Sequence, residues 1–370
     1  MKIAIVTGPF QPLPPKGCGA VEKIWWSLAT EFARRGNAVK VVSCRWDDEL
    51  TQEVVDGVTI ERIKRFKRSG NIGIDLLKDF FYSINVMLRL KNYEVTILNT
   101  FWLPVLCVIN KSSLGKIVFN VARFPKGQMK YYRGVSLFAA VSSSVAQATK
   151  LEIPTQNIKI IPNPIDTKCF TIPDSVRDYS GKKVIAYSGR IHKEKGLEIL
   201  IKAFNHLCKG FEDIELKIVG PIDIELGGGG HEYYQSLVNL SEDSPVTFVP
   251  PIFDQDGLAA FLKNAHFYCY PSIAEKGESF GVAPLEAMGT GLPVVVSDLS
   301  CFRDFVEDGT AGLVFDHRLP DADIQLAEKL RSLLLNDNLR EKICDAGYKK
   351  SREYSVENIA QKYITEFANI

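Results

Sequence analysis

The stretch from residue 270 to residue 296, YPSIAEKGESFGVAPLEAMGTGLPVVV, constrains the fold more than any other part of the chain. Residues 265–271 are mostly apolar and predict the end of a buried strand, and a polar loop follows them. Residues 284–288 predict a short helix, because proline is tolerated in a first helical turn. Residues 293–297 predict the next strand. The stretch therefore indicates the order strand, loop, helix, strand.

Two carboxylates flank the start of this helix. Glu278 lies in the preceding loop and Glu286 about one turn inside the helix. A helix N-terminus offers free N–H groups and a partial positive charge, which suit a phosphate. A carboxylate beside it accepts hydrogen bonds from sugar or ribose hydroxyls. The two features can hold an anion and a polyol together, although on spacing alone two solvated glutamates are the simpler explanation.

The α/β pattern begins twice along the chain. Residues 2–7 predict a strand, and a loop rich in Pro and Gly leads from there into a predicted helix at 20–35. The order is that of nucleotide-binding folds, but Gly17-Cys18-Gly19 does not continue as the dinucleotide fingerprint G-x-G-x-x-G. After a linker-like segment at 162–181, the pattern restarts with a predicted strand at 184–188. A length of 370 residues suits two such domains.

Composition places the protein among reduced, cytoplasmic proteins. No apolar run reaches the length of a membrane span, and the first residues lack the cleavage site of a signal peptide. The eight cysteines are widely spaced and include no C-x-x-C, which favours free thiols in the cytoplasm.

The near-neutral net charge hides a strong asymmetry. Residues 1–165 hold 23 basic and 12 acidic residues, and no acid occurs at 95–151. Such a field attracts anionic partners, and no nucleic-acid motif is present. We therefore expect these basic residues to bind an anionic membrane surface, the inner face of the plasma membrane. The alternatives are that they bind a soluble phosphorylated acceptor or form a basic face that is only solvated. The residues expected to dock, around Phe66, are Arg62, Lys64, Arg65, Lys67 and Arg68.

Three motifs resemble those of one enzyme family. The string P-S followed by E-S-F-G-x2-P-L-E-A-M-x2-G-x-P-V-V-x-S, at 271–297, resembles the donor-site signature of the retaining glycosyltransferases of family 4. Gly189-Arg190 with Lys195-Gly196 resembles the G-R-x4-K-G motif of that family. Residues 158–166 resemble its hinge between domains. The resemblance covers almost the whole chain.

The resemblance implies a fold and an activity. The fold is GT-B, an α/β architecture of two Rossmann-like doubly wound parallel-sheet domains facing across a cleft. Residues 1–165 would form the acceptor-side domain and residues 166–352 the donor-binding domain, with the last helix, at about 353–370, packing back on the first. The activity is transfer of a sugar from a nucleotide-diphosphate sugar, a UDP-sugar as first choice, to a sugar or lipid-linked acceptor. The pathway would be polysaccharide or glycoconjugate synthesis.

The resemblance also assigns residues. It implies catalytic roles for Glu278, Arg190 and Lys195, the two cations neutralising the diphosphate. The donor-binding residues that it implies are Glu286, Gly17, Gly19, Gly189, Gly220, Ile252, Phe280, Gly281, Val282 and Ala283. The acceptor side departs from the family pattern, because Asn120 and Arg123 stand where a histidine often occurs.

We expect neither a metal ion nor another cofactor. The D-x-D strings at 254–256 and 321–323 lack the strand context of a metal motif, and the five histidines form no ligand set. Alternatives within the same fold are a non-catalytic sugar-nucleotide-binding protein, an epimerase or a phosphorylase, although no pyridoxal-phosphate lysine motif is recognisable.

Overall fold

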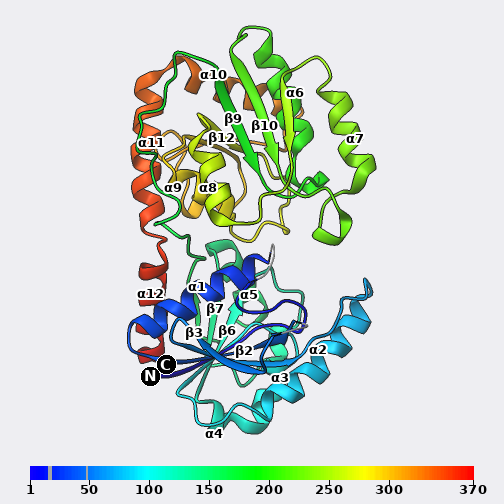
Figure 1. The fold of residues 1–370 in the computed structure, drawn as a ribbon, viewed down its shortest axis with the longest axis vertical. Coiled ribbons are helices and arrows are strands. Elements are labelled where there is room, and N and C mark those ends of the chain that lie inside the picture. The colour runs from blue at the N-terminus through cyan, green and yellow to red at the C-terminus, as the bar shows by residue number, and fades with distance from the viewer. Residues whose placement is uncertain (16–18, 47–48) are drawn as a thin grey trace. The chain divides into compact units, whose positions relative to one another are not determined.

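A computed structural model describes residues 1–15, 19–46 and 49–370 (Figure 1). The chain divides into two compact units. Unit 1 comprises Met1–Pro164 and Val356–Ile370, and unit 2 comprises Ile165–Ser355. The chain therefore passes from one unit to the other twice, and its last segment belongs to the same unit as its first.

Unit 1 contains an eight-stranded sheet in the order β3-β4-β2-β1-β5-β6-β7-β8. All neighbouring strands pair in parallel except β3 and β4. Four of the five residues of the central strand β1 are buried, because helices cover both faces of a parallel sheet. The strands are β1 (Lys2–Val6), β2 (Ala38–Arg45), β3 (Gln52–Val55), β4 (Val58–Lys64), β5 (Val95–Leu98), β6 (Lys116–Val121), β7 (Leu137–Ala140) and β8 (Ile158–Ile160).

The antiparallel strand β3 was not expected from the sequence. It pairs with β4 through a two-residue turn, Asp56-Gly57, in which both residues have positive φ, at 50° and 78°. A turn of this kind matches the twist of a hairpin, and Asp-Gly is its usual sequence. The dipeptide was therefore the available signal for this hairpin.

The last helix of the chain packs on the first helix. Tyr363 and Phe367 of α12 lie against Trp25 and Phe32 of α1, with ring centroids 5.5 Å apart for Trp25–Tyr363. These four side chains belong to the buried core of unit 1. The helices of unit 1 are α1 (Ala20–Arg34), α2 (Ile72–Met87), α3 (Leu103–Leu106), α4 (Lys111–Leu114), α5 (Ser143–Glu152) and α12 (Val356–Asn369).

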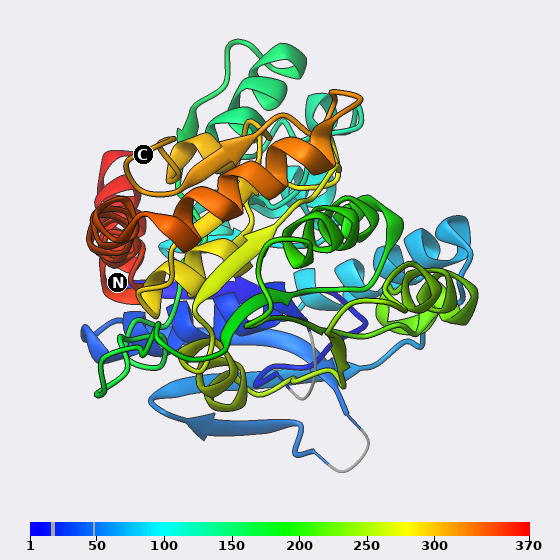
Figure 2. The same ribbon diagram turned by 90° about the horizontal axis from the view of Figure 1, so that it is seen from above.

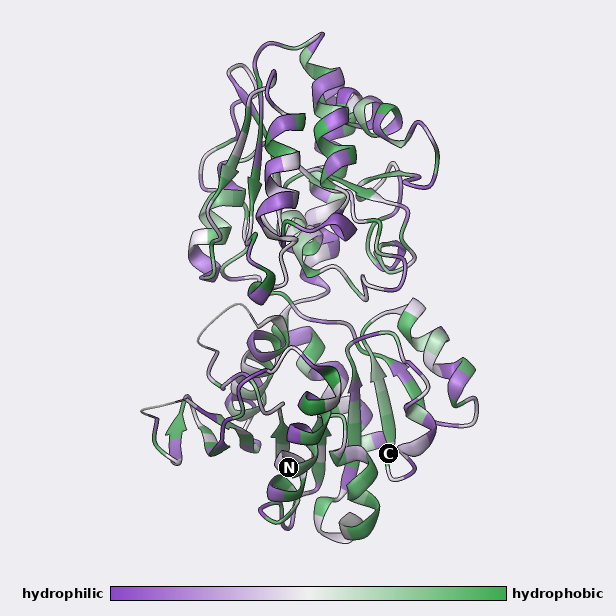
Figure 3. Ribbon diagram, turned by 90° about the vertical axis from the view of Figure 1, so that its right-hand side faces the viewer, coloured by the Kyte–Doolittle hydropathy of each residue, from purple (hydrophilic) through white to green (hydrophobic). Residues whose placement is uncertain are grey.

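Unit 2 contains a six-stranded parallel sheet in the order β11-β10-β9-β12-β13-β14. Its strands are flanked by helices (Figure 2) and are apolar along most of their length (Figure 3). The strands are β9 (Lys183–Ser188), β10 (Ile214–Val219), β11 (Val246–Val249), β12 (Phe267–Tyr270), β13 (Val294–Ser297) and β14 (Leu313–Phe315). The helices are α6 (Leu197–Cys208), α7 (Gly230–Leu240), α8 (Gln255–Lys263), α9 (Val282–Gly289), α10 (Ala322–Leu335) and α11 (Asp337–Arg352).

Because all strands of each sheet except β3 run in parallel, the loops that follow them gather at one edge, where ligands bind in such folds. The seven cysteines that the structure describes are free thiols. Within the described residues, no helix has both the length and the apolar composition that a bilayer crossing needs.

Candidate active site

Two glycines form a close backbone contact at the carboxyl edge of unit 2. Gly189 follows β9 and Gly220 follows β10, with φ of 154° and 156°. A Cβ atom at Gly220 would lie 1.8 Å from the carbonyl oxygen of Gly189. Both positions therefore require glycine. The backbone at these two glycines carries no side chain and lies next to the turn that contains Arg190 and Lys195.

Lys195 and Glu278 form a partly buried ion pair at the same edge. The Nζ of Lys195 lies 2.7 Å from Oε2 of Glu278, although the residues are 83 positions apart. The hydroxyl of Tyr270, the last residue of β12, donates to the same oxygen at 3.2 Å. Within the described residues, Oε1 of Glu278 accepts no hydrogen bond. The structure thus brings two predicted catalytic residues together and leaves one carboxylate oxygen available.

The backbone at Gly196 places this lysine. Gly196 has φ of 67°, and a Cβ there would lie 2.1 Å from the carbonyl oxygen of Pro271. Only glycine lets the turn that contains Lys195 lie this close to the end of β12. The glycine of the motif therefore sets the approach of Lys195 to Glu278.

Arg190 has other hydrogen-bond partners. Its guanidinium donates to Oε1 of Glu194 at 2.6 Å and to the carbonyl oxygen of Gly227 at 2.9 Å. Sequence reasoning missed both partners, although Glu194 lies four residues after the arginine. The backbone N–H groups of residues 227–230 all donate to carbonyl oxygens of the same unit, so this glycine run is a hydrogen-bonded loop.

The start of α9 lies next to Glu278. Gly281 caps the helix with φ of 86°, and a Cβ there would lie 2.3 Å from Cε1 of Phe302. No side chain caps the helix, and Val282 and Ala283 of its first turn are only half-buried. The first-turn N–H groups therefore suit an anion.

The remaining residues that were predicted to bind the donor lie in different environments. Glu286, inside α9, is half-buried and contributes, after burial itself, to the raised pKa of Tyr268. Ile252 is half-buried in the loop after β11. Phe280 is buried against Phe305 and Tyr354, so its side chain belongs to the core of unit 2.

A cavity of about 380 Å³ lies at the carboxyl ends of β1, β5 and β6 in unit 1. The predicted acceptor-side residues Asn120 and Arg123 both line it. The amide of Asn120 donates to Oδ1 of Asn99 at 2.8 Å. Sequence reasoning missed Asn99 and Thr100, which follow β5 at this edge. The hydroxyl of Thr100 is buried and has no hydrogen-bond partner in the described structure, so it can serve a bound ligand.

Charged side chains of both signs line this cavity. Burial raises the pKa of Glu22, while the charges of Arg68 and Arg123 act in the opposite direction. The carboxylate of Glu22 lies against Gly19, the N-cap of α1. Gly17 lies outside the described residues. Asp79 also lines the cavity, and burial raises its pKa to about 6 although it accepts hydrogen bonds from the backbone of Phe101 and Trp102.

The basic cluster expected to dock on a membrane is only partly exposed. Arg62 is buried and forms ion pairs with Glu49 and Glu53, because alternation along β4 turns it inward. The expectation was wrong for Arg62. Arg65 is half-buried and stacks over Trp46, with its guanidinium carbon 3.6 Å from the ring centroid. Lys64, Lys67 and Arg68 are exposed, and Arg68 also lines the cavity.

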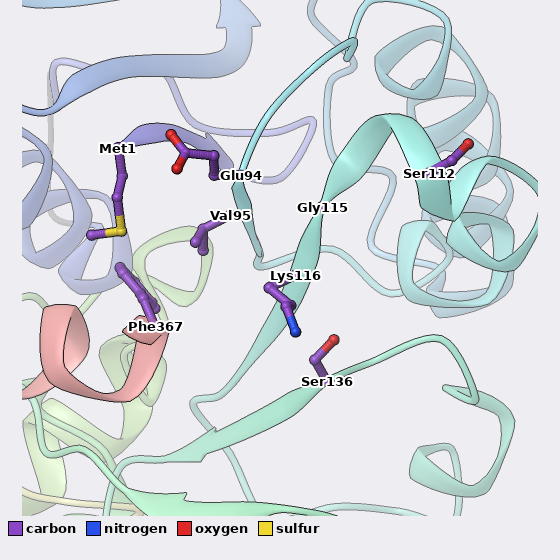
Figure 4. A pocket seen from close by; sticks show the side chains of 8 residues that line it. All are labelled: Met1, Glu94, Val95, Ser112, Gly115, Lys116, Ser136 and Phe367. Carbon is purple, nitrogen blue, oxygen red and sulfur yellow. The ribbon is translucent and has the colours of Figure 1, made fainter. Parts of the chain in front are cut away.

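A second cavity of unit 1, of about 620 Å³, lies at the amino ends of β5 and β6 (Figure 4). Glu94, Lys116 and Ser136 contribute its polar groups, and Phe367 of α12 covers one side. The Glu94 carboxylate accepts from the backbone N–H of Lys2 at 2.6 Å. This cavity is at the opposite edge of the sheet from Asn120 and Arg123 and contains no predicted site residue.

The two D-x-D strings lie at helix starts. Asp254 caps α8 by accepting from the backbone N–H of Gly257 at 2.6 Å, and Asp321 is the N-cap of α10. Asp323 lies 3.3 Å from Nε2 of His206. Within the described residues, no group of three or more His, Cys, Asp or Glu side chains could hold a metal ion.

Residues 170–350 match the family model described as glycosyl transferases group 1. A phosphatidyl-myo-inositol mannosyltransferase of Mycobacterium leprae is 28% identical over 274 residues, which cover 72% of this chain and 67% of that protein.

Solved structures resemble the whole chain. Sucrose-phosphate synthase from Thermosynechococcus elongatus has a TM-score of 0.80 at 18% identity and covers 100% of both chains. The Anabaena protein HepE, in complex with UDP and glucose, has a TM-score of 0.74 at 18% identity and also covers 100% of both chains. The whole chain therefore has the GT-B fold, and residues 170–350, which lie in unit 2, match the glycosyl transferases group 1 family.

Proposed function

We propose that this protein transfers a sugar from a nucleotide-diphosphate sugar to an acceptor hydroxyl, with retention of anomeric configuration and without a metal ion. The ion pair between Lys195 and Glu278 carries the proposal. Departure of a nucleotide diphosphate develops negative charge, which a positioned cation and a helix start stabilise. Lys195 and the start of α9 supply these features next to a carboxylate that can orient the sugar.

The free oxygen of Glu278 defines its role. Lys195 and Tyr270 both bind Oε2. A sugar hydroxyl that donates to Oε1 leaves the ion pair intact, so Glu278 can orient the donor while Lys195 remains in place. Glu286, farther along α9, is assigned to the ribose hydroxyls. Arg190 contributes to the diphosphate from the Glu194–Gly227 side of the turn.

A UDP-sugar is the first candidate donor, and HepE, a protein of similar fold, was solved with UDP and glucose. The acceptor is assigned to the cavity of unit 1 and bears a phosphate. Arg68 and Arg123 provide cations there, while Asn99, Asn120 and Thr100 provide hydrogen bonds to hydroxyls. The names phosphatidyl-myo-inositol mannosyltransferase and sucrose-phosphate synthase each refer to a phosphorylated polyol.

Nucleotide release from UDP-, GDP- and dTDP-sugars by the purified full chain tests the proposal. We expect UDP release that persists in EDTA, and a product whose anomeric proton shows retention by NMR. Glu278→Gln should lower kcat more than it raises KM, whereas Glu286→Gln should mainly raise KM. The exposed Glu242→Gln is the matched control and should match the wild type.

Two of the alternatives have their own signatures in this assay. Nucleotide binding without release indicates a non-catalytic binding protein, and conversion of the donor sugar without release indicates an epimerase. Activity lost in EDTA and restored by magnesium or manganese contradicts the metal-independent mechanism.

A further inference from the structure

Helix α2 turns polar side chains inward and large apolar side chains outward. Its buried residues are Asp79, Tyr82, Ser83 and Val86. Its exposed residues, with the residue that follows the helix, include Ile72, Ile74, Leu77, Phe81 and Leu88. A surface helix of a water-exposed protein normally has the opposite arrangement. An exposed set of large apolar side chains on one element indicates an interaction surface.

Four of these apolar side chains share one face of the helix. Ile74, Leu77, Phe81 and Leu88 follow one another at spacings of three, four and seven residues, which align along an α-helix. Leu77 and Phe81 are 56% and 52% exposed.

The neighbouring short helices also expose apolar side chains. The indole N–H of Trp102, at the start of α3, donates to the carbonyl oxygen of Leu76, so α3 is attached to α2. Val108 and Ile109, in the turn after α3, are exposed. We define the α2 face as Ile74, Leu77, Phe81 and Leu88.

Cations border this face. Residues 64–91 contain seven basic and two acidic residues. Of the two acids, Asp79 is buried and Asp75 pairs with Lys78 at 3.4 Å. Lys67 is exposed next to α2, because its carbonyl oxygen accepts a hydrogen bond from Lys78. Arg89 pairs with Glu61 at 3.2 Å, whereas the exposed Lys64, Lys67 and Lys91 form no ion pair within the described residues, so the unpaired charge of this segment is positive.

We propose that the α2 face lies in the interface of an anionic lipid bilayer. Apolar side chains bordered by lysine and arginine match the acyl boundary and the anionic headgroups of such a surface. A protein partner fits less well, because lysine is depleted in protein interfaces. This surface differs from the cluster expected from the sequence, in which Arg62 and Arg65 have partners within unit 1.

The same helix connects the bilayer to the proposed acceptor cavity. Asp79, on the inner side of α2, lines that cavity. A helix is about 10 Å in diameter, so docking by the outer side holds the cavity within about one helix diameter of the headgroups. The structure thus suits an acceptor whose lipid tail stays in the bilayer. This step rests on the proposed function, whereas membrane binding can be measured without it.

Co-sedimentation of the full chain with vesicles tests the docking surface. We expect binding to phosphatidylcholine vesicles that contain phosphatidylglycerol, and little binding to pure phosphatidylcholine. The double variant Leu77→Gln/Phe81→Gln should reduce vesicle affinity by at least about tenfold, since each substitution removes apolar area that would be buried in the bilayer interface. High salt should weaken wild-type binding by screening the cations.

The double variant Ile224→Gln/Leu335→Gln is the matched control, because it removes two exposed apolar side chains of unit 2. It should bind like the wild type. Equal binding by the Leu77/Phe81 variant, or no wild-type binding at low salt, overturns the proposal. A concentration-dependent dimer that the Leu77/Phe81 variant abolishes, without vesicle binding, identifies a second copy as the occupant and also overturns it. UDP release in the absence of lipid should be unchanged in this variant, which separates failure of docking from failure of the transferase assignment.

Discussion

Two cations of one sequence motif, Arg190 and Lys195, occupy different environments in the folded protein. Lys195 is buried and pairs with Glu278, whereas the side chain of Arg190 is 43% exposed and pairs with Glu194. The motif predicted a common role in neutralising a diphosphate. The structure adds that only Lys195 also balances a partly buried carboxylate, so the two residues should differ in their effect on stability.

We predict that Lys195→Ala lowers the free energy of unfolding by about 3 kcal/mol, because it leaves the Glu278 carboxylate partly buried without its cation. Arg190→Ala should change it by less than about 0.5 kcal/mol, as is usual for an exposed pair. Both variants should weaken nucleotide binding and turnover. Denaturant unfolding followed by circular dichroism measures the difference. The double variant Lys195→Ala/Glu278→Ala should recover stability without recovering turnover, and equal stability of the two single variants would contradict the assignment.

Asp79 should make the stability of unit 1 depend on pH. Burial raises the pKa of its carboxyl from 3.8 to about 6, so the folded state binds this proton more tightly than the unfolded state. The stability that the protonated form contributes is present below about pH 4 and is lost as pH rises through about 6. At about 1.4 kcal/mol per pKa unit, the loss approaches about 3 kcal/mol.

Asp79→Asn should remove this dependence. The wild-type free energy of unfolding, measured relative to the variant, should fall between about pH 4 and about pH 7. Tryptophan emission can follow the unfolding of unit 1, because all four tryptophans, at 25, 26, 46 and 102, belong to it. A difference that does not change with pH would show that Asp79 keeps an ordinary pKa.

At the scale of elements, the loops at the strand ends determine the site more than the strands do. The start of α9 is an example, because its cap Gly281 combines a positive φ with a close approach to Phe302. The helix start can present its N–H groups beside Glu278 only if no Cβ is present at this position.

Gly281→Ala should therefore destabilise unit 2 by about 2 kcal/mol or more and reduce donor affinity, since both the backbone conformation and the packing oppose a side chain. Gly210→Ala, after α6, is the matched control, because a Cβ there meets no atom within 4 Å and φ is not in the left-handed region. Thermal unfolding and nucleotide titration of both variants give the comparison. Normal nucleotide affinity in Gly281→Ala would remove the helix start from the donor site.

At the scale of the whole molecule, the C-terminal helix belongs to the unit formed by the N-terminal half. Tyr363 lies between Trp25 and Phe32 of α1, where it is buried. The stability of unit 1 should thus depend on a residue that follows all of unit 2 in the sequence.

Tyr363→Ala should lower the stability of unit 1 by about 4 kcal/mol, as expected for the loss of a buried aromatic side chain. Its thermal transition, observed by tryptophan emission, should shift to lower temperature. Lys362→Ala, at an exposed neighbouring position of α12, should leave that transition unchanged. An unchanged transition in Tyr363→Ala would show that α12 does not contribute to the core of unit 1.

The sequence by itself predicted the repeated α/β pattern and the strands at 2–7, 184–188, 265–271 and 293–297, because buried parallel strands and their glycine-marked turns leave strong local signals. Its motifs also resemble those of one glycosyltransferase family. It also identified Glu278, Lys195, Asn120 and Arg123 as site candidates. It did not reveal hairpin β3, which depended on one Asp-Gly dipeptide.

Only the tertiary structure decided the partner of each charge. The pairing of Lys195 with Glu278 joins residues 83 positions apart, which local sequence does not encode. The same reason applies to α2, because only packing shows that Leu77 and Phe81 are exposed while Asp79 is buried.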